Sequence, residues 1–232
     1  MKKYDNSSIS ALKGADRVRK RPAVIFGSDG VEGCEHSMFE ILSNSIDEAR
    51  EGFGSTITVT RYADMSIEVE DFGRGIPVDY NEKEKRYNWE LVFCELYAGG
   101  KYNNNDGGDY EYSLGLNGLG ACATQYSSEY MDVEILRDGF KFNLHFEHGK
   151  NVGGLEKIEF RHRHTGTKIH WKPDLKVFTS IDIPVENYHS VLKRQAVVNS
   201  GVKFIFKNEV SKGQFEETEY FYENGIVDYV KE

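Results

Sequence analysis

The stretch from Phe39 to Ala49 places side chains that could bind a metal ion on one side of a predicted helix. Its apolar residues recur at three- and four-residue intervals, which is typical of a helix with one buried face. The opposite face carries Glu40, Asn44, Asp47 and Glu48. Three carboxylates and an amide suit a divalent cation and a water molecule, but a solvated charged face has the same pattern.

A second cluster has the sequence DFGRGIP over residues 71–77 and follows a predicted strand. A buried Asp71 at a strand end could accept a hydrogen bond from an exocyclic amine, and the glycines would let the backbone approach a ligand closely. If Arg74 is covered, it needs an anionic partner, and Glu48 is a candidate. The alternative is a tight turn that Asp71 caps.

A third cluster, GLNGLG at residues 115–120, precedes a predicted helix that runs to about residue 127. Glycines before a helix expose backbone N–H groups and the positive end of the helix dipole, which favours phosphate binding. The order matches neither the dinucleotide-binding fingerprint nor a P-loop. Residues 102–112 are rich in Asn, Asp and Gly, and we expect a mobile lid there.

Composition limits the class of protein. With 232 residues, 39% of them hydrophobic, the chain can bury a core as one large domain or two small ones. A net charge of −9 argues against a main nucleic-acid-binding surface. The separate cysteines Cys34, Cys94 and Cys122 predict reduced, mostly buried thiols. The sequence shows neither a membrane span nor a signal peptide, so we expect a cytoplasmic protein.

Hydrophobic periodicity predicts a mixture of helices and hairpins. Helices are expected over residues 14–21, 34–51, 89–97, 120–127 and 185–200. Hairpins are expected to pair residues 57–62 with 66–70, 131–137 with 140–146, and 155–161 with 167–171. A further strand is expected at 202–207, followed by an irregular acidic connection over 215–230. The histidines at 145, 148, 162 and 164 are expected to face solvent rather than bind a metal.

The order and spacing of the three clusters resemble the ATPase superfamily that includes gyrases, histidine kinases and mismatch-repair proteins. The nearest likeness is to the N-terminal ATPase domain of B-type subunits of bacterial type IIA topoisomerases. The motifs that carry it are RVRKRP (17–22), SIDEA (45–49), GRGIP (73–77), AGGK (98–101), TGT (165–167) and YENGI (222–226). The chain departs from that pattern at Ala23, Ser43, Phe72 and Glu111.

This resemblance implies an α/β (α+β) two-layer sandwich, the Bergerat ATP-binding fold, in which a mixed, mostly antiparallel sheet has helices on one face. It implies an N-terminal arm over residues 1–13, an ATP-binding domain over 14–220, and the start of a connection to a transducer domain over 221–232. The cofactors that it implies are ATP and Mg²⁺.

The resemblance also assigns roles to individual residues. Glu40 resembles the general base that activates water, Asn44 the Mg²⁺ ligand, and Asp71 the residue that recognises adenine. Thr167 lies where the family holds a water between itself, the aspartate and adenine, and Arg74 with Glu48 resembles the salt bridge at the pocket mouth. The remaining implied contacts are Gly75 at the nucleotide, Ile76, Pro77 and Arg137 at the rim used by aminocoumarin inhibitors, Lys101, Tyr110, Gly115, Leu116, Asn117, Gly118, Leu119 and Gly120 at the phosphates, and Tyr4 in the partner's site.

Three functions are compatible with these features. The first is an ATPase domain that dimerises with a second B-type protomer and, with an A-type subunit and DNA, drives strand passage. The second is a nucleotide-gated clamp with little hydrolysis, which the altered lid residues would favour. The third, a histidine kinase catalytic domain, fits the basic segment 17–22 and the AGGK and TGT motifs less well.

Overall fold

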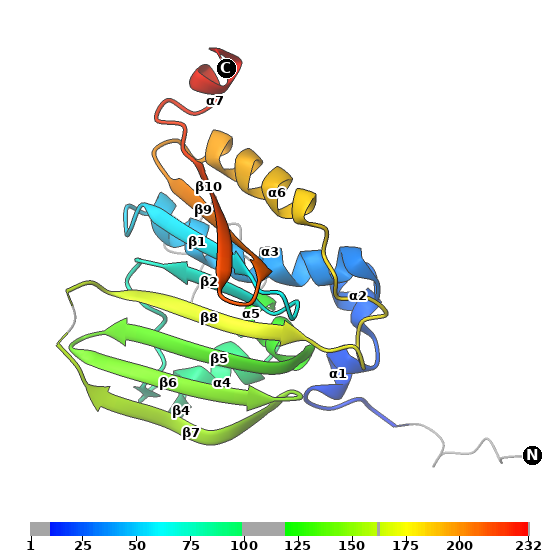
Figure 1. Ribbon diagram of the computed structural model, residues 1–232. Helices are drawn as coiled ribbons and strands as arrows, with labels where there is room; N and C mark the ends of the chain where they lie inside the picture. Colours follow the sequence, from blue (N-terminus) through cyan, green and yellow to red (C-terminus); the bar gives the residue numbers. More distant parts are fainter. Residues whose placement is uncertain (1–9, 99–118, 162, 232) are drawn as a thin grey trace, which may run out of the picture.

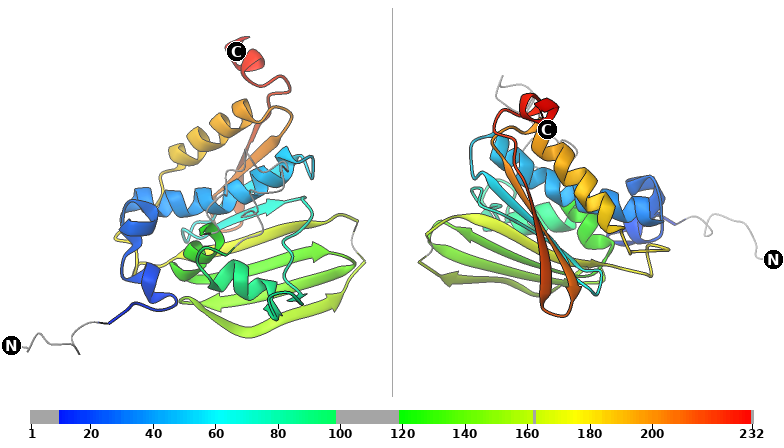
Figure 2. Two further views of the ribbon diagram at one scale, coloured as in Figure 1. Left: turned by 180° about the vertical axis from the view of Figure 1, so that it is seen from behind. Right: turned by 45° about the horizontal axis from the view of Figure 1, so that its top comes forward.

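The computed structural model describes residues 10–98, 119–161 and 163–231. These residues form an eight-stranded sheet with helices packed on one face (Figures 1 and 2). The strand order is β10-β9-β1-β2-β8-β5-β6-β7, and every neighbouring pair is antiparallel except β1 with β9. The architecture is therefore the expected two-layer sandwich with a mixed, mostly antiparallel sheet.

The helices are α1 (Asp16–Arg19), α2 (Pro22–Phe26), α3 (Val31–Arg50), α4 (Asn88–Cys94), α5 (Gly120–Tyr126), α6 (Val185–Val198) and α7 (Ile226–Lys231). The strands of the main sheet are β1 (Thr56–Arg61), β2 (Ile67–Asp71), β5 (Ser128–Arg137), β6 (Phe140–Glu147), β7 (Lys150–Glu159), β8 (Gly166–Pro173), β9 (Lys203–Ser211) and β10 (Gln214–Tyr220). A separate two-stranded ribbon joins β3 (Tyr80–Asn81) to β4 (Arg86–Tyr87).

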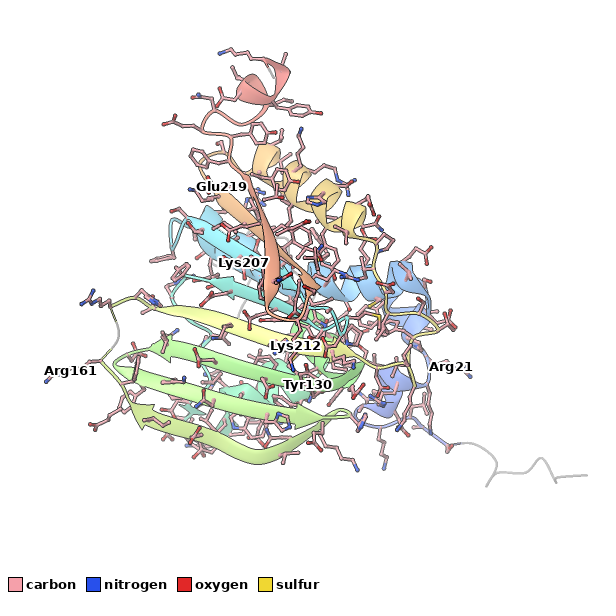
Figure 3. All side chains as sticks on the ribbon, viewed as in Figure 1. Arg21, Tyr130, Arg161, Lys207, Lys212 and Glu219 are labelled. Atoms are coloured by element: carbon pink, nitrogen blue, oxygen red, sulfur yellow. The ribbon has the colours of Figure 1, made fainter. Side chains whose placement is uncertain are left out.

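Alternation along the strands explains the two layers. In β8, Ile169 and Trp171 are buried while the intervening residues are only partly covered. The other face of the sheet carries polar side chains such as Tyr130, Lys207 and Glu219, which point away from the helices (Figure 3). The core therefore lies between the sheet and α3, α5 and α6, where apolar side chains leave water.

Helix α3 confirms the predicted apolar stripe in part: Leu42 and Ile46 are fully buried, whereas Phe39 and Ala49 are only partly buried and pack against the core. The polar face differs from the prediction in one respect. Asp47 is only 4% exposed, so it is buried rather than accessible to solvent. The reason is that α3 packs against both α5 and the strands β1, β2 and β8, so it is covered on more than its apolar stripe.

Several expected pairings and boundaries are wrong. Strands β7 and β8 do not form a hairpin, because β7 pairs only with β6 while β8 lies between β2 and β5. The expected irregular connection after residue 214 contains β10, which pairs with β9, and then α7. Helix α2, which begins with Pro22 in its first turn, was not predicted, and α4 ends at Cys94 rather than at residue 97.

The cysteines match the expected free thiols. Cys34 and Cys122 are buried and Cys94 is half-buried, and no disulfide joins them. Burial raises the pKa of Cys34 to about 12 and that of Cys94 to about 11, so both stay protonated at neutral pH. Among the described residues, no helix is long and apolar enough to cross a membrane.

A buried ion pair fastens α1 to the body of the domain. Arg19 Nη2 lies 2.5 Å from Asp174 Oδ2, and the Asp174 side chain is only 4% exposed. Asp174 also accepts hydrogen bonds from His148 Nδ1 at 2.9 Å and from the Lys176 backbone N–H at 2.8 Å. Burial alone would raise the pKa of Asp174, but these donors hold it below its usual value.

We expect Asp174→Asn to lower the free energy of unfolding at neutral pH by about 2 kcal/mol, because Arg19 loses its counter-charge in a covered site. A lowered carboxyl pKa stabilises the fold above the ordinary aspartate pKa, and this stabilisation disappears as pH falls through the folded-state value. Urea unfolding at neutral and acid pH should therefore show a difference between wild type and variant that shrinks in acid. Asp16→Asn, which breaks the exposed pair with Lys20, is the matched control and should change little. A neutral-pH effect of Asp174→Asn no larger than this control would contradict the assignment.

Candidate functional site

Asp71 is a buried carboxylate held at the end of β2 by donors from three segments. Ser45 Oγ donates to Oδ2 at 2.7 Å, and the backbone N–H groups of Gly73 and Thr167 donate to Oδ1 at 2.9 and 3.3 Å. The residue is 8% exposed, and burial raises its pKa although these hydrogen bonds oppose the shift. The carboxylate is thus fixed in one orientation while still able to accept a further hydrogen bond from a ligand.

The turn before β8 interlocks with the segment that follows Asp71. Thr165 Oγ1 donates to the Gly73 carbonyl at 2.5 Å, and the Ile76 N–H donates to Thr167 Oγ1 at 3.1 Å. A Cβ on Gly166 would lie 2.2 Å from the Asp71 carbonyl oxygen, so only glycine permits this approach. The structure therefore brings Asp71 and Thr167 together, as the resemblance implied, and places Ile76 beside Thr167.

The predicted pairing of Arg74 with Glu48 is present at the exposed edge of this segment. Arg74 Nε and Nη2 lie 3.0 and 2.8 Å from the two carboxylate oxygens of Glu48. Two further contacts were not predicted: Glu51 Oε2 lies 2.5 Å from Nη2, and the guanidinium carbon lies 4.1 Å from the Phe53 ring centroid. The hydrogen bond and the charge of Glu48 raise the pKa of Arg74, so it remains a cation.

The rim residues predicted from the resemblance also lie together. Arg137 Nη1 donates to the Gly75 carbonyl at 2.8 Å, and its Nε pairs with Asp138 at 2.9 Å. Gly75 has a φ of +81°, and a Cβ there would lie 3.0 Å from Ile135 Cγ2 and from the Leu136 carbonyl oxygen. Strand β5 thus closely approaches the chain just before Ile76 and Pro77.

Glu40 lies on α3 beside the first residue of α5. A Cβ on Gly120 would be 2.4 Å from Glu40 Oε2, so the glycine allows α5 to begin against this carboxylate. Glu40 Oε1 lies 3.1 Å from His36 Nε2, and the other ring nitrogen of His36 lies 3.2 Å from the Phe26 carbonyl oxygen. Because a carbonyl oxygen only accepts, a hydrogen bond between His36 and Phe26 is donated by Nδ1.

Sequence reasoning missed His36, although the four-residue spacing from Glu40 on one helix could have indicated it. Asn44 lies one turn beyond Glu40 on α3 and is partly exposed. In the described part of the chain, no group of three or more His, Cys, Asp or Glu side chains could hold a metal ion by itself. A single amide oxygen is compatible with Mg²⁺ that takes its other ligands from phosphate and water.

Only some of the predicted phosphate contacts fall within the described part of the chain. Leu119 precedes α5 and Gly120 begins it. The remaining phosphate contacts and the arm residue lie outside the described residues: Tyr4, Lys101, Tyr110, Gly115, Leu116, Asn117 and Gly118.

Comparison with known proteins gives consistent results, although no family model matches the sequence. The chain is 38% identical over 231 residues to the B subunit of DNA gyrase from Thermotoga maritima, a match that covers 100% of the chain and 35% of that protein. It is 40% identical over 235 residues to the B subunit of DNA gyrase from Streptococcus pyogenes, with the same coverage. The chain thus spans about a third of the length of these relatives.

A solved structure supports the same relationship. The topoisomerase IV ATP-binding domain of Francisella tularensis, in complex with a small-molecule inhibitor, superposes with a TM-score of 0.78 at 32% identity. That match covers 95% of this chain and 57% of the other. The likeness therefore extends over nearly the whole of this chain.

Proposed function

We propose that this chain, which belongs to the family of ATP-binding domains of B-type subunits of bacterial type II topoisomerases, binds ATP beside Asp71 and hydrolyses it with Glu40 as general base. The observation that carries the proposal is the orientation of the buried Asp71 carboxylate. Ser45, Gly73 and Thr167 fix it as an acceptor at the end of β2, a central strand of the sheet. Adenine offers its 6-amino group to such an acceptor, whereas guanine carries a carbonyl oxygen at the same ring position, which the carboxylate would repel.

The phosphates then extend along α3 toward Glu40. Its carboxylate can take a proton from a water in line with the γ-phosphate, and Gly120 keeps the space beside it free of a side chain. Asn44 would hold Mg²⁺ through its amide oxygen, and the metal would neutralise charge on the phosphates when bound. His36 would orient Glu40, which it contacts at 3.1 Å.

The wider assembly follows from the same family relationship. We infer an ATP-dependent dimer with a second B-type protomer in which the arm over residues 1–13 supplies Tyr4, and an action on DNA together with an A-type subunit in the cytoplasm. Aminocoumarin-type inhibitors would bind at the rim formed by Ile76, Pro77 and Arg137.

A thermal unfolding experiment tests whether the site prefers adenine to guanine nucleotides. The chain is heated with Mg²⁺ and a non-hydrolysable ATP analogue or the corresponding GTP analogue. Ligand at 100 times its dissociation constant stabilises a fold by about 2.7 kcal/mol, which for a domain of this size corresponds to about 5–10 °C in Tm. We expect this shift with the adenine nucleotide and almost none with the guanine nucleotide. Equal shifts would contradict recognition of adenine by Asp71.

A further inference from the structure

Arg19 joins α1 to the carboxyl end of α5. Its Nη1 donates to the backbone carbonyls of Tyr126 at 2.9 Å and Ser128 at 3.3 Å, while Nη2 pairs with Asp174. The guanidinium thus covers carbonyl groups where α5 ends and β5 begins, which is a favourable place for a cation. Figure 2 shows α1 beside the end of α5 and the turn between β6 and β7.

Helix α5 connects this contact to the proposed catalytic carboxylate. It has only seven residues, so about 10 Å separate its ends. Gly120, its first residue, packs against Glu40, and Tyr126, its last, accepts the hydrogen bond from Arg19. The Tyr126 hydroxyl also donates to the Cys94 carbonyl at the end of α4. A displacement at Gly120 therefore reaches Arg19 through one short rigid element.

The other polar contacts of α1 are on its surface or within its own segment. Lys20 pairs with Asp16, and both side chains are more than half exposed. Arg17 Nε donates to the nearby Leu12 carbonyl. Val18 is buried, but apolar packing is less directional than a hydrogen bond. Among the described residues of α1, Arg19 is thus the cation whose side chain donates a hydrogen bond to the end of α5.

We propose that Arg19 is a positioning residue that transmits nucleotide binding at the Glu40 end of α5 to α1. The proposal rests on the proposed function. Nucleotide bound beside Glu40 restrains the start of α5, and the hydrogen bond from Arg19 to the Tyr126 carbonyl links the other end of α5 to α1. By linkage, restraint of α1 strengthens nucleotide binding by the same factor.

Hydrogen–deuterium exchange on the whole chain tests this coupling. The amides of residues 16–21 donate to backbone carbonyls within the α1 region and report its opening. Exchange is measured with Mg²⁺ and a saturating non-hydrolysable ATP analogue, and without nucleotide. In the wild type we expect nucleotide to slow exchange of these amides several-fold. In Arg19→Gln the nucleotide should still bind, but the slowing at residues 16–21 should disappear.

Two further variants separate coupling from folding. Lys20→Gln removes the same charge from the same helix and should keep the wild-type response. Arg19→Lys keeps a cation beside Asp174 but lacks the planar fork, so it should fold and lose at least half of the response. A full response in Arg19→Lys or Arg19→Gln would overturn the proposal, as would the absence of a response in nucleotide-bound wild type. If wild type does not bind nucleotide at all, the proposed function itself fails.

Discussion

Replacing Glu40 by alanine is expected to slow ATP hydrolysis by about 100-fold or more, while nucleotide affinity stays within a few-fold of wild type. A positioned general base contributes roughly 10²–10⁴-fold to a rate, and the Glu40 carboxylate on α3 lies against the start of α5. Its removal takes away the proton acceptor for water but leaves Asp71 and its hydrogen-bond donors unchanged. Single-turnover assays at high protein concentration can measure the slow reaction, and calorimetry can measure binding.

His36→Ala is the informative companion to this variant. His36 touches Glu40 but not the proposed adenine contact, so we expect a smaller loss of rate, about 10-fold, with binding retained. Turnover by Glu40→Ala equal to that of wild type would exclude the general-base role. Tight binding with no detectable turnover in wild type, even in single-turnover assays, would favour the nucleotide-gated clamp instead.

Replacing Gly166 by alanine is expected to damage both the fold and the nucleotide site. The new Cβ would lie 2.2 Å from the Asp71 carbonyl oxygen, so the start of β8 must move away from β2. Such overpacking costs about 1–3 kcal/mol in stability. The same movement separates the Thr167 N–H from Asp71 Oδ1, so we expect nucleotide affinity to fall at least 10-fold. Urea unfolding and a nucleotide titration measure the two effects.

Gly139→Ala provides the control for Gly166→Ala. Gly139 has a φ of +81°, but a Cβ there would meet no atom within 4 Å. Alanine at this position should therefore cost about 1 kcal/mol through backbone strain alone and leave nucleotide affinity unchanged. If Gly166→Ala binds nucleotide as well as Gly139→Ala does, the close approach of β8 to Asp71 does not matter for the site.

Local sequence patterns predicted the parts of this fold that depend on local contacts. The long α3 has a strong apolar stripe, and the β5–β6 hairpin closes at Asp138 and Gly139, so neighbouring residues are sufficient to specify them. The position of β8 between β2 and β5 depends on contacts between strands that are far apart in the sequence. A local pattern does not contain that information, so the prediction joined β8 to β7.

The site, too, was predicted only in part, because local sequence patterns indicate some of its contacts and not others. Arg74 and Glu48 could be paired because the sequence offered a cation in a glycine-rich turn and a carboxylate on the polar face of the preceding helix. The contact of Phe53 with Arg74 depends on how the chain leaves α3, which hydrophobic periodicity does not describe. Asp47 was misplaced because helix periodicity gives the direction of a side chain but not what packs over it.

The central claim is that Asp71 anchors an adenine nucleotide, and calorimetric titration with a Mg²⁺–ATP analogue tests it most directly. Wild type should show saturable binding, and Asp71→Ala should weaken it by at least 100-fold, because both the hydrogen bond to adenine and the arrangement of Ser45 and Thr167 are lost. The variant should keep the circular dichroism spectrum of the wild type, which shows that the fold survives the substitution. Binding of equal strength by the variant, or no binding by a folded wild type, would contradict the account.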